Sequence, residues 1–134
     1  MKEIDIYNGN DYVLKGTFYE SSHSRDQILI YFHGGGFIFG ERDDLPKEYI
    51  EVITQYFHLL TVDYRLLPEA NFNDILLDLH NIHDYVHEDF SEVYCMGRSA
   101  GGFLSLIYAS QYDIQGIIDF YGFYDVQDQS FNKV

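Results

Sequence analysis

Four short, almost uninterrupted apolar runs constrain the fold of this chain more than any other feature. They occupy residues 28–32, 59–62, 93–96 and 117–120. Runs in which apolar and polar residues do not alternate are typical of strands covered on both faces, as in parallel sheets. Apolar stripes at helical spacing separate the runs: Tyr49, Ile50, Ile53 and Phe57; Ile75, Leu76, Leu79, Ile82, Tyr85 and Val86; Phe103, Leu104, Ile107 and Tyr108. The alternation predicts an open α/β sheet with right-handed crossovers, and Pro46 suits the first turn of the first helix.

The N-terminal stretch adds an antiparallel element. Residues 4–19 alternate in character around Asn8-Gly9-Asn10-Asp11. This pattern predicts a β-hairpin in which the Asn-Gly pair supplies the positive φ values of a tight turn. The sheet is therefore expected to be mixed, with the hairpin at one edge.

Composition limits the partners of the chain. Its 134 residues suit one domain, residues 1–134, and 46% of them are hydrophobic. A formal net charge of −14 disfavours nucleic acid and anionic membrane surfaces. One cysteine excludes an internal disulfide and a Cys-pair zinc site. The N-terminus does not resemble a signal peptide and no apolar run has the length of a membrane span, so we expect a cytoplasmic protein that binds no membrane.

A serine at a predicted strand-to-helix junction is the first candidate for chemistry. Gly97-Arg98-Ser99-Ala100-Gly101 fits G-x-S-x-G, after a predicted strand and before a predicted helix. Such a turn projects the serine, its glycines admit neighbouring backbone, and the helix N-terminus directs N–H groups at a developing oxyanion. The alternative is a glycine-softened turn that carries a serine by chance. The context favours a nucleophile.

A second glycine cluster, His33-Gly34-Gly35-Gly36-Phe37, follows the first buried run. Consecutive glycines allow close backbone approach to a ligand, and the context matches an oxyanion loop. A phosphate cradle is the competing interpretation, but no Gly-Lys-Ser/Thr follows, and no G-x-G-x-x-G opens a helix. A plain flexible loop is the other alternative. We expect no cofactor.

Two further features have simpler explanations. His80, His83 and His87 share one helical face beside Asp84 and Glu88. A metal site is conceivable there, but a polar helix flank is the favoured interpretation, and we expect no metal. Cys95 lies in a predicted buried strand, which favours a small core residue over a reactive thiol.

Three segments together resemble one family. The segments are the glycine cluster, then Asp63-Tyr64-Arg65-Leu66-Leu67-Pro68-Glu69, then the serine turn extended to Gly102. Their order and approximate spacing resemble those of the hormone-sensitive-lipase-like esterase and lipase branch of the α/β-hydrolases. The resemblance covers about residues 28–124 and corresponds to the N-terminal half of that fold. It implies a mostly parallel sheet with flanking helices, incomplete because the C-terminal strands are absent.

Carried over by position, the resemblance assigns roles to individual residues. Ser99 would be the nucleophile, and the amides of Gly35, Gly36 and Ala100 would form the oxyanion hole. The segment 63–69 would brace the glycine loop, with Arg65 and Glu69 as internal partners. The supporting residues of the three motifs would be His33, Gly34, Gly97, Gly101, Asp63 and Arg65.

Arg98 departs from the family pattern, in which an acidic residue is frequent. This departure bears on substrate preference more than on the turn itself.

The remaining members of a catalytic triad have no counterpart in the sequence. In this fold the acid and then the histidine follow the serine, yet all six histidines precede Ser99. Asp119, Asp125 and Asp128 follow Ser99 too closely to match the family's acid. His33 as a substitute base is disfavoured, because in the family it shapes the oxyanion loop.

Two functions stay open on these residues. The first is the serine-bearing half of a carboxylic-ester hydrolase, with the acid and the histidine supplied from elsewhere. Apolar and aromatic residues near the motifs favour a small hydrophobic ester: Phe37, Phe39, Tyr64 and Phe103. The second is an inactive hydrolase scaffold that binds a small carboxylate or another protein.

The last predicted strand has a consequence for assembly. If residues 114–120 form the edge of the sheet, their backbone and an uncovered face are open to pairing. We therefore expect self-association, as a homo-oligomer, through this edge or face.

Overall fold

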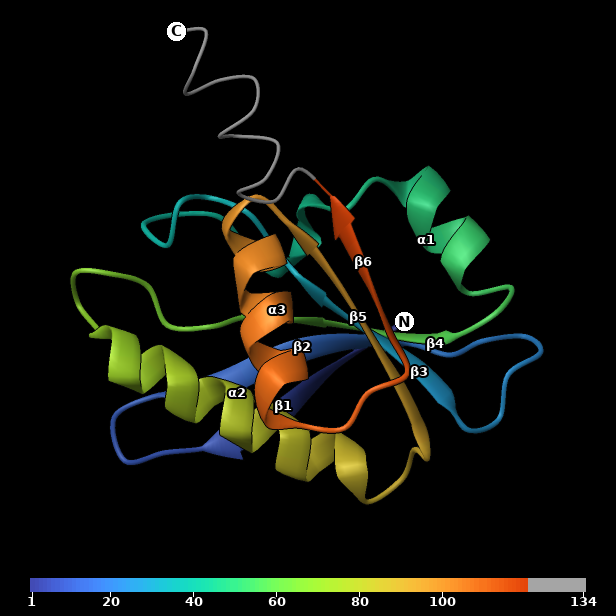
Figure 1. Cartoon of the computed structure of the whole chain (residues 1–134), viewed down its shortest axis with the longest axis horizontal. Coiled ribbons are helices and arrows are strands. Elements are labelled where there is room, and N and C mark those ends of the chain that lie inside the picture. The colour runs from blue at the N-terminus through green and yellow to red at the C-terminus, as the bar shows by residue number, and fades with distance from the viewer. Residues whose placement is uncertain (121–134) are drawn as a thin grey trace, which may run out of the picture.

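The computed structural model describes residues 1–120, which form a six-stranded sheet in the order β1-β2-β4-β3-β5-β6 (Figure 1). The strands are β1 (Lys2–Asn8), β2 (Val13–Tyr19), β3 (Gln27–Phe32), β4 (His58–Val62), β5 (Glu92–Arg98) and β6 (Gly116–Phe120). The helices are α1 (Lys47–Ile53), α2 (Phe72–His87) and α3 (Ala100–Gln111), and a 3-10 turn η1 (Arg42–Asp44) precedes α1.

The sheet is mixed, as the sequence predicts. β4, β3, β5 and β6 pair in parallel, and every one of the four apolar runs lies in one of them. β1 and β2 form an antiparallel hairpin that joins β4 at one edge. Nearly all residues of the central strands β3 and β4 are buried, so both faces of these strands are covered, which explains why their apolar residues do not alternate with polar ones.

The hairpin turn differs from the predicted one. Gly9 does not have a positive φ. The connection runs from Gly9 to Tyr12, and the Gly9 N–H donates to the Tyr12 carbonyl oxygen at 2.8 Å. A connection of this length closes without left-handed residues. A glycine is favoured at position 9 because the Tyr12 ring packs closely against it, and a Cβ there would lie 2.7 Å from that ring.

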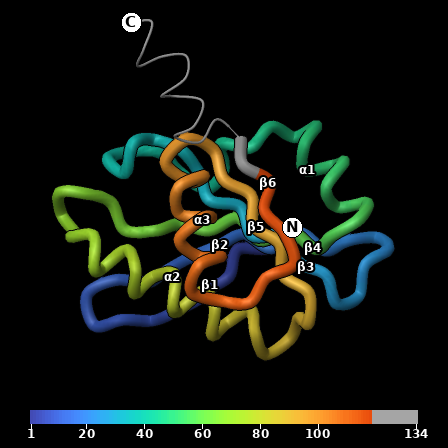
Figure 2. Tube along the Cα trace, viewed as in Figure 1, coloured from blue at the N-terminus to red at the C-terminus, as the bar shows by residue number. Residues whose placement is uncertain are grey.

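The helices divide unequally between the two faces of the sheet (Figures 1 and 2). α2 and α3 pack against the larger core cluster, which includes Ile30, Leu79 and Leu104. Of the three helices in the described residues, α1 is the one that packs on the smaller cluster, on the other face of the sheet. Within residues 1–120, no helix combines the length and apolar character needed to cross a membrane.

Helix α1 is shorter than its apolar stripe predicts. It ends at Ile53, so Phe57 lies beyond it, and Pro46 stands directly before the first turn rather than inside it. The Thr54 hydroxyl donates to the Ile50 carbonyl oxygen at 2.8 Å. β4 begins at His58, so the chain turns between these points, and the Phe57 side chain packs on the smaller cluster from outside the helix.

Candidate functional site

Ser99 stands at a sharp turn between β5 and α3. Its φ of 56° and ψ of −118° lie in a region that non-glycine residues rarely adopt. The flanking glycines are required by close backbone contacts. A Cβ at Gly97 would lie 2.0 Å from the Gly101 carbonyl oxygen, and a Cβ at Gly101 would lie 1.9 Å from the Phe32 carbonyl oxygen. The local sequence therefore forces the serine into this turn.

The first turn of α3 leaves an amide available beside the serine. The Gly102 N–H donates to the Ser99 carbonyl oxygen at 2.9 Å. The Ala100 N–H has no hydrogen-bond partner in the part of the chain that the structure describes. It lies at the positive end of the helix dipole, where an anion is stabilised.

The glycine loop after β3 folds back on the serine turn. Gly35 and Gly36 have φ values of 126° and 62°, which glycine adopts readily. A Cβ at Gly34 would lie 2.9 Å from the Arg98 carbonyl oxygen and 3.4 Å from the Ser99 Cβ. The fold therefore brings the two predicted motifs into direct contact. The N–H groups of Gly35 and Gly36 donate no hydrogen bond within residues 1–120, whereas the Gly35 carbonyl oxygen accepts from the N–H groups of Ile38 and Phe39.

The segment after β4 braces this loop. The Tyr64 hydroxyl donates to the His33 carbonyl oxygen at 2.7 Å, and the two rings stack with centroids 4.3 Å apart. The Leu67 N–H donates to the Phe37 carbonyl oxygen at 2.8 Å. Burial raises the pKa of Tyr64, so its hydroxyl stays a donor at neutral pH. Asp63 is held by an ion pair with Arg42.

Arg65 is an internal partner, as expected, but Glu69 is not. Arg65 donates through its backbone N–H (2.8 Å) and Nε (3.1 Å) to the carboxylate of Asp78, which is fully buried on α2. Burial raises the pKa of Asp78, opposed by the lowering effect of Arg65. Glu69 is exposed and forms no hydrogen bond or ion pair with any residue in the range 1–120. The buried carboxylate on α2 takes its place.

His33 is engaged with the glycine loop. The residue is only 1% exposed, and its ring Nδ1 lies 2.7 Å from the Gly34 carbonyl oxygen. A Cβ at Gly40 would lie 2.8 Å from the same nitrogen. No hydrogen bond joins His33 to Ser99 among the described residues. A base for the serine is therefore not provided by this ring.

Arg98 is directed to the face of the sheet that carries α1. Tyr31 donates to Asp44 at 2.6 Å. Burial and the Asp44 carboxylate raise the pKa of Tyr31, whereas Arg98 beside the hydroxyl lowers it. The basic residue in the serine turn thus lies beside the hydroxyl of Tyr31, which itself donates to Asp44 of η1.

Aromatic rings gather beside the glycine loop. The Phe37 ring meets Phe72, Phe103 and Tyr64 edge-on, with centroids 6.0, 6.2 and 6.4 Å away. Phe72, at the start of α2, was not singled out in the sequence. Phe39, which was, is 69% exposed and belongs to no such cluster. We call Phe37, Phe72, Phe103 and Tyr64 the aromatic cluster.

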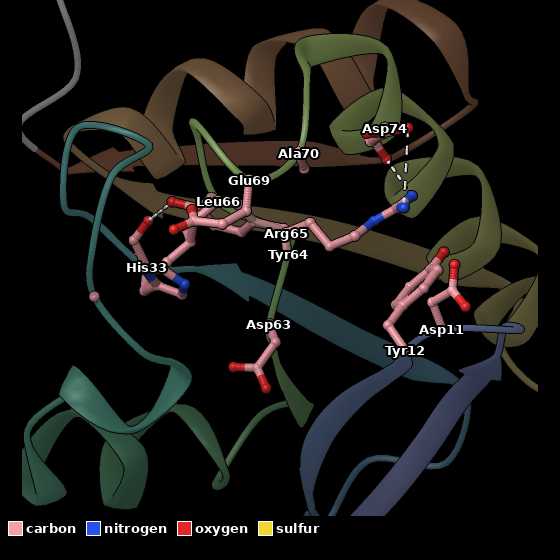
Figure 3. Close-up of a pocket in the computed structure, with 11 residues that line it drawn as sticks. Asp11, Tyr12, His33, Asp63, Tyr64, Arg65, Leu66, Glu69, Ala70 and Asp74 are labelled. Atoms are coloured by element: carbon pink, nitrogen blue, oxygen red, sulfur yellow. Dashed lines mark hydrogen bonds and ion pairs between the residues drawn. The ribbon is translucent and has the colours of Figure 1, made fainter.

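A pocket of about 530 Å³ lies along the bracing segment (Figure 3). His33 and Tyr64 line one end of it, and Arg65 extends toward Asp74 at the other. The tip of the N-terminal hairpin also lines it, with the Arg65 guanidinium 4.0 Å above the Tyr12 ring. Motif analysis missed Tyr12 and Asp78. The sequence signal for Asp78 was its position as an acidic residue beside the apolar stripe of α2, which indicates a buried polar partner.

The other candidate residues are the helical histidines, Cys95 and three aspartates that follow Ser99. His83 stacks on Tyr112 at 4.1 Å and lies beside His87. No three His, Cys, Asp or Glu side chains of residues 1–120 are grouped so as to hold a metal ion. Cys95 is fully buried, and burial raises the pKa of its thiol, which marks it as a core residue. Asp119 belongs to β6, whereas Asp125 and Asp128 lie outside the described residues.

Known proteins match this chain over much of its length. The probable carboxylesterase M8 of Phoma sp. is 28% identical over 124 residues, which cover 76% of this chain and 39% of that protein. A Staphylococcus aureus protein of unknown function aligns with a TM-score of 0.85 at 33% identity, over 91% of this chain and 46% of its own. An α/β-hydrolase superfamily protein of Enterococcus faecalis aligns with a TM-score of 0.78 at 29% identity, over 90% of this chain and 46% of its own.

The chain thus spans less than half the length of these proteins. Residues 29–132 match the family model of the α/β-hydrolase fold. That match covers most of the sequence and includes the serine turn, the glycine loop and the segment that braces it. The chain belongs to the α/β-hydrolase family and corresponds to an N-terminal part of that fold.

Proposed function

We propose that this chain is the serine-bearing part of a carboxylic-ester hydrolase. The observation that carries the proposal is the contact between the strained serine turn and the glycine loop, in which Gly34 approaches the Ser99 Cβ. A nucleophile and a set of free amides are thereby held together at a helix N-terminus. The similarity to a probable carboxylesterase supports the same reaction class.

The reaction begins with attack of the Ser99 Oγ on the ester carbonyl carbon. The oxygen of the tetrahedral intermediate takes on negative charge and accepts hydrogen bonds from the amides of Gly35, Gly36 and Ala100. Fixed donors of this kind stabilise a transition state without reorganisation, and removing one typically costs about 10² to 10³ in rate. The alcohol then leaves, and water hydrolyses the acyl-enzyme.

The proton of the serine must pass to a base. A serine hydroxyl without a base is a weak nucleophile at neutral pH. None of the six histidines follows Ser99 in the sequence, and His33 is engaged with the glycine loop. We therefore propose that the acid and the histidine come from polypeptide that completes the fold. The residues present still provide binding and oxyanion stabilisation, which alone sustain about 10³ to 10⁴ over the uncatalysed rate.

The aromatic cluster favours a small hydrophobic substrate. Phe72 is 37% exposed and Phe37 is half-buried, so part of this apolar surface is open beside the glycine loop. Burial of an acyl chain on these rings contributes about 25 cal/mol of binding free energy for each Å² of apolar surface removed from water. Short-chain esters such as butyrates are the proposed class.

Labelling with a fluorophosphonate tests the nucleophile directly. The Ser99 oxygen displaces fluoride from phosphorus, and the serine proton is released to solvent. We expect slow labelling confined to the peptide that contains Ser99, absent in Ser99→Ala and retained in Ser110→Ala, since Ser110 is an exposed serine on α3. Labelling must also disappear in urea. Labelling spread over several serines, or unchanged in Ser99→Ala, would refute the proposal.

The alternative is a scaffold that binds a small carboxylate at the same amides without turnover. The engagement of His33 away from Ser99 favours it. Calorimetric titration with butyrate separates the two. Measurable binding combined with a complete lack of fluorophosphonate labelling supports the scaffold.

A further inference from the structure

The pocket along the bracing segment is distinct from the candidate site around Ser99. Its volume of about 530 Å³ is in the range of small-molecule sites. Its lining includes His33 and Tyr64, but neither Ser99 nor any residue proposed for the oxyanion hole. Asp11 and Tyr12, at the tip of the N-terminal hairpin, close the other end (Figure 3). The pocket can therefore hold a ligand of its own.

Carboxylates predominate among the charged groups that line this pocket. They belong to Asp11, Asp63, Glu69 and Asp74. Arg65 is the one lysine or arginine among the described residues of the lining, and its guanidinium lies 3.1 Å from the buried carboxylate of Asp78, which neutralises it. A cleft lined mainly by one sign of charge concentrates ligands of the opposite sign. The lining therefore favours a cation.

Two of the four carboxylates are available to such a ligand. Asp63 forms an ion pair with Arg42, and Asp74 belongs to the capping box of α2. Asp11 and Glu69 are exposed and form no hydrogen bond or ion pair with any residue in the described part of the chain. Figure 3 shows Glu69 at the glycine-loop end of the pocket and Asp11 at the hairpin end. The free negative charges thus stand at two separate points.

His33 adds a buried acceptor at the same end as Glu69. A carbonyl oxygen cannot donate, so the 2.7 Å contact of Nδ1 with the Gly34 carbonyl oxygen requires the ring proton on Nδ1 and leaves Nε2 as the acceptor of the neutral ring. Nε2 forms no hydrogen bond within residues 1–120. The sealed side-chain polar atoms without a partner in that range belong to Thr61, Asn81 and Tyr108. His33 is only 1% exposed and Nε2 is not among these atoms, so this nitrogen is reached from the pocket that His33 lines.

An organic cation fits this lining better than a metal ion. No three His, Cys, Asp or Glu side chains within residues 1–120 are grouped so as to hold a metal. Tyr12, Leu66 and Ala70 add apolar surface, which suits methylene groups and supplies no oxygen ligand for a hard cation. A buried ring nitrogen that lacks a donor is satisfied by an N–H group of the occupant.

We propose that this pocket binds a linear polyamine, an aliphatic chain with an ammonium group at each end. One ammonium group donates to the Glu69 carboxylate and to Nε2 of His33, and the other pairs with Asp11. The methylene chain packs on Leu66 and Ala70. The proposal makes no use of Ser99, so its failure and the failure of the hydrolase proposal are separable.

Titration with spermidine, followed by proton–nitrogen NMR of the whole chain, tests this site. We expect saturable binding, with shifts confined to amides that line the pocket. Asp11→Asn and Glu69→Gln should each weaken binding by about two- to fivefold, the value of one exposed ion pair. n-Butylamine, which carries one ammonium group, should bind more weakly than spermidine by at least about twofold for the same reason.

A matched control separates the pocket from the overall charge. The double variant Asp26→Asn/Glu48→Gln removes the same charge as Asp11→Asn/Glu69→Gln, from exposed positions outside the lining, and should leave the affinity nearly unchanged. The ring nitrogen resonances supply a second readout. Nε2 of His33 should shift during the titration, whereas the ring of the exposed His23 should not respond.

Each outcome decides the proposal. A response that does not saturate, or equal losses in the two double variants, would show counter-ion attraction to a chain of net charge −14 and would overturn it. The same shifts with magnesium chloride at equal ionic strength, or an unmoved Nε2 resonance of His33, would also overturn it. Ser99→Ala must bind spermidine as the wild type does. The amide spectra of the variants show that they fold, since the substituted side chains are exposed.

Discussion

At the scale of single residues, backbone strain is concentrated at the candidate site. Among residues 1–120, the non-glycine residues with positive φ are Phe37 and Ser99, and they lie in the glycine loop and the serine turn. Each such conformation costs about 1–3 kcal/mol and persists only where its surroundings enforce it. The enforcing contacts here are backbone atoms that approach glycines.

Gly101→Ala tests this enforcement. Its added Cβ would overlap the Phe32 carbonyl oxygen at 1.9 Å, and backbone cannot move aside easily. We expect a loss of at least about 2 kcal/mol in the free energy of unfolding, measured in urea. Gly36→Ala is the control, because its Cβ would meet nothing within 4 Å and only the left-handed conformation at φ 62° costs about 1 kcal/mol. Equal losses in the two variants would contradict the steric argument.

His83 makes stability depend on pH. Burial lowers the pKa of His83 below its ordinary 6.5. Repulsion from His87 and His80 lowers it further, and the attraction of Asp84 opposes this shift. The unfolded chain therefore binds a proton more readily, so this contribution to stability is present above about pH 6.5 and decreases as the pH falls. Urea midpoints at pH 7.5 and 5.5 should differ less in His83→Gln than in the wild type. His23→Gln, outside the cluster, should leave the difference unchanged; if both variants behave alike, His83 is not responsible.

At the scale of elements, the sequence predicts what depends on local pattern and misses what depends on distant pairing. The four apolar runs became parallel strands, and the central two, β3 and β4, are buried on both faces. The serine turn and the glycine loop lie where their flanking runs imply. The partner of Arg65 could not be derived from the motif, because Asp78 approaches it only after α2 packs on the sheet. The end of α1 and the form of the hairpin turn are likewise decided by where the next strand begins.

Asp78→Ala tests the link between α2 and the bracing segment. Removing a fully buried carboxylate leaves the Arg65 guanidinium without its main partner, and breaking such a pair costs about 3–5 kcal/mol. The Arg65 side chain keeps 24% exposure, so we expect about 3 kcal/mol by urea unfolding. Asp84→Ala, which removes the exposed His80–Asp84 pair on the same helix, should cost less than about 1 kcal/mol. Comparable losses would show that Asp78 does not anchor the segment.

At the scale of the whole molecule, the described residues form a sheet with one well-covered face and one partly covered face. Ser99 and the glycine loop come from neighbouring connections at the same end of β3 and β5, which explains why motifs distant in sequence are adjacent in the fold. The acid and the histidine of the family could not be located from sequence, because no residue of this chain matches them. In the proposed reaction, slow acylation of Ser99 by a reactive ester would draw on these residues alone, whereas deacylation would need a base that activates water.

The most direct measurement is the mass of the chain after incubation with p-nitrophenyl butyrate. The p-nitrophenolate leaves without protonation, so attack by Ser99 needs no general acid, and the serine proton passes to solvent. Without a base to activate water, the acyl-enzyme should accumulate. We predict one butyryl group on the peptide that contains Ser99, none in Ser99→Ala, and the wild-type level in Ser110→Ala. A folded chain that acquires no butyryl group, or acquires it at another residue, would contradict the assignment of Ser99 as an oxyanion-assisted nucleophile.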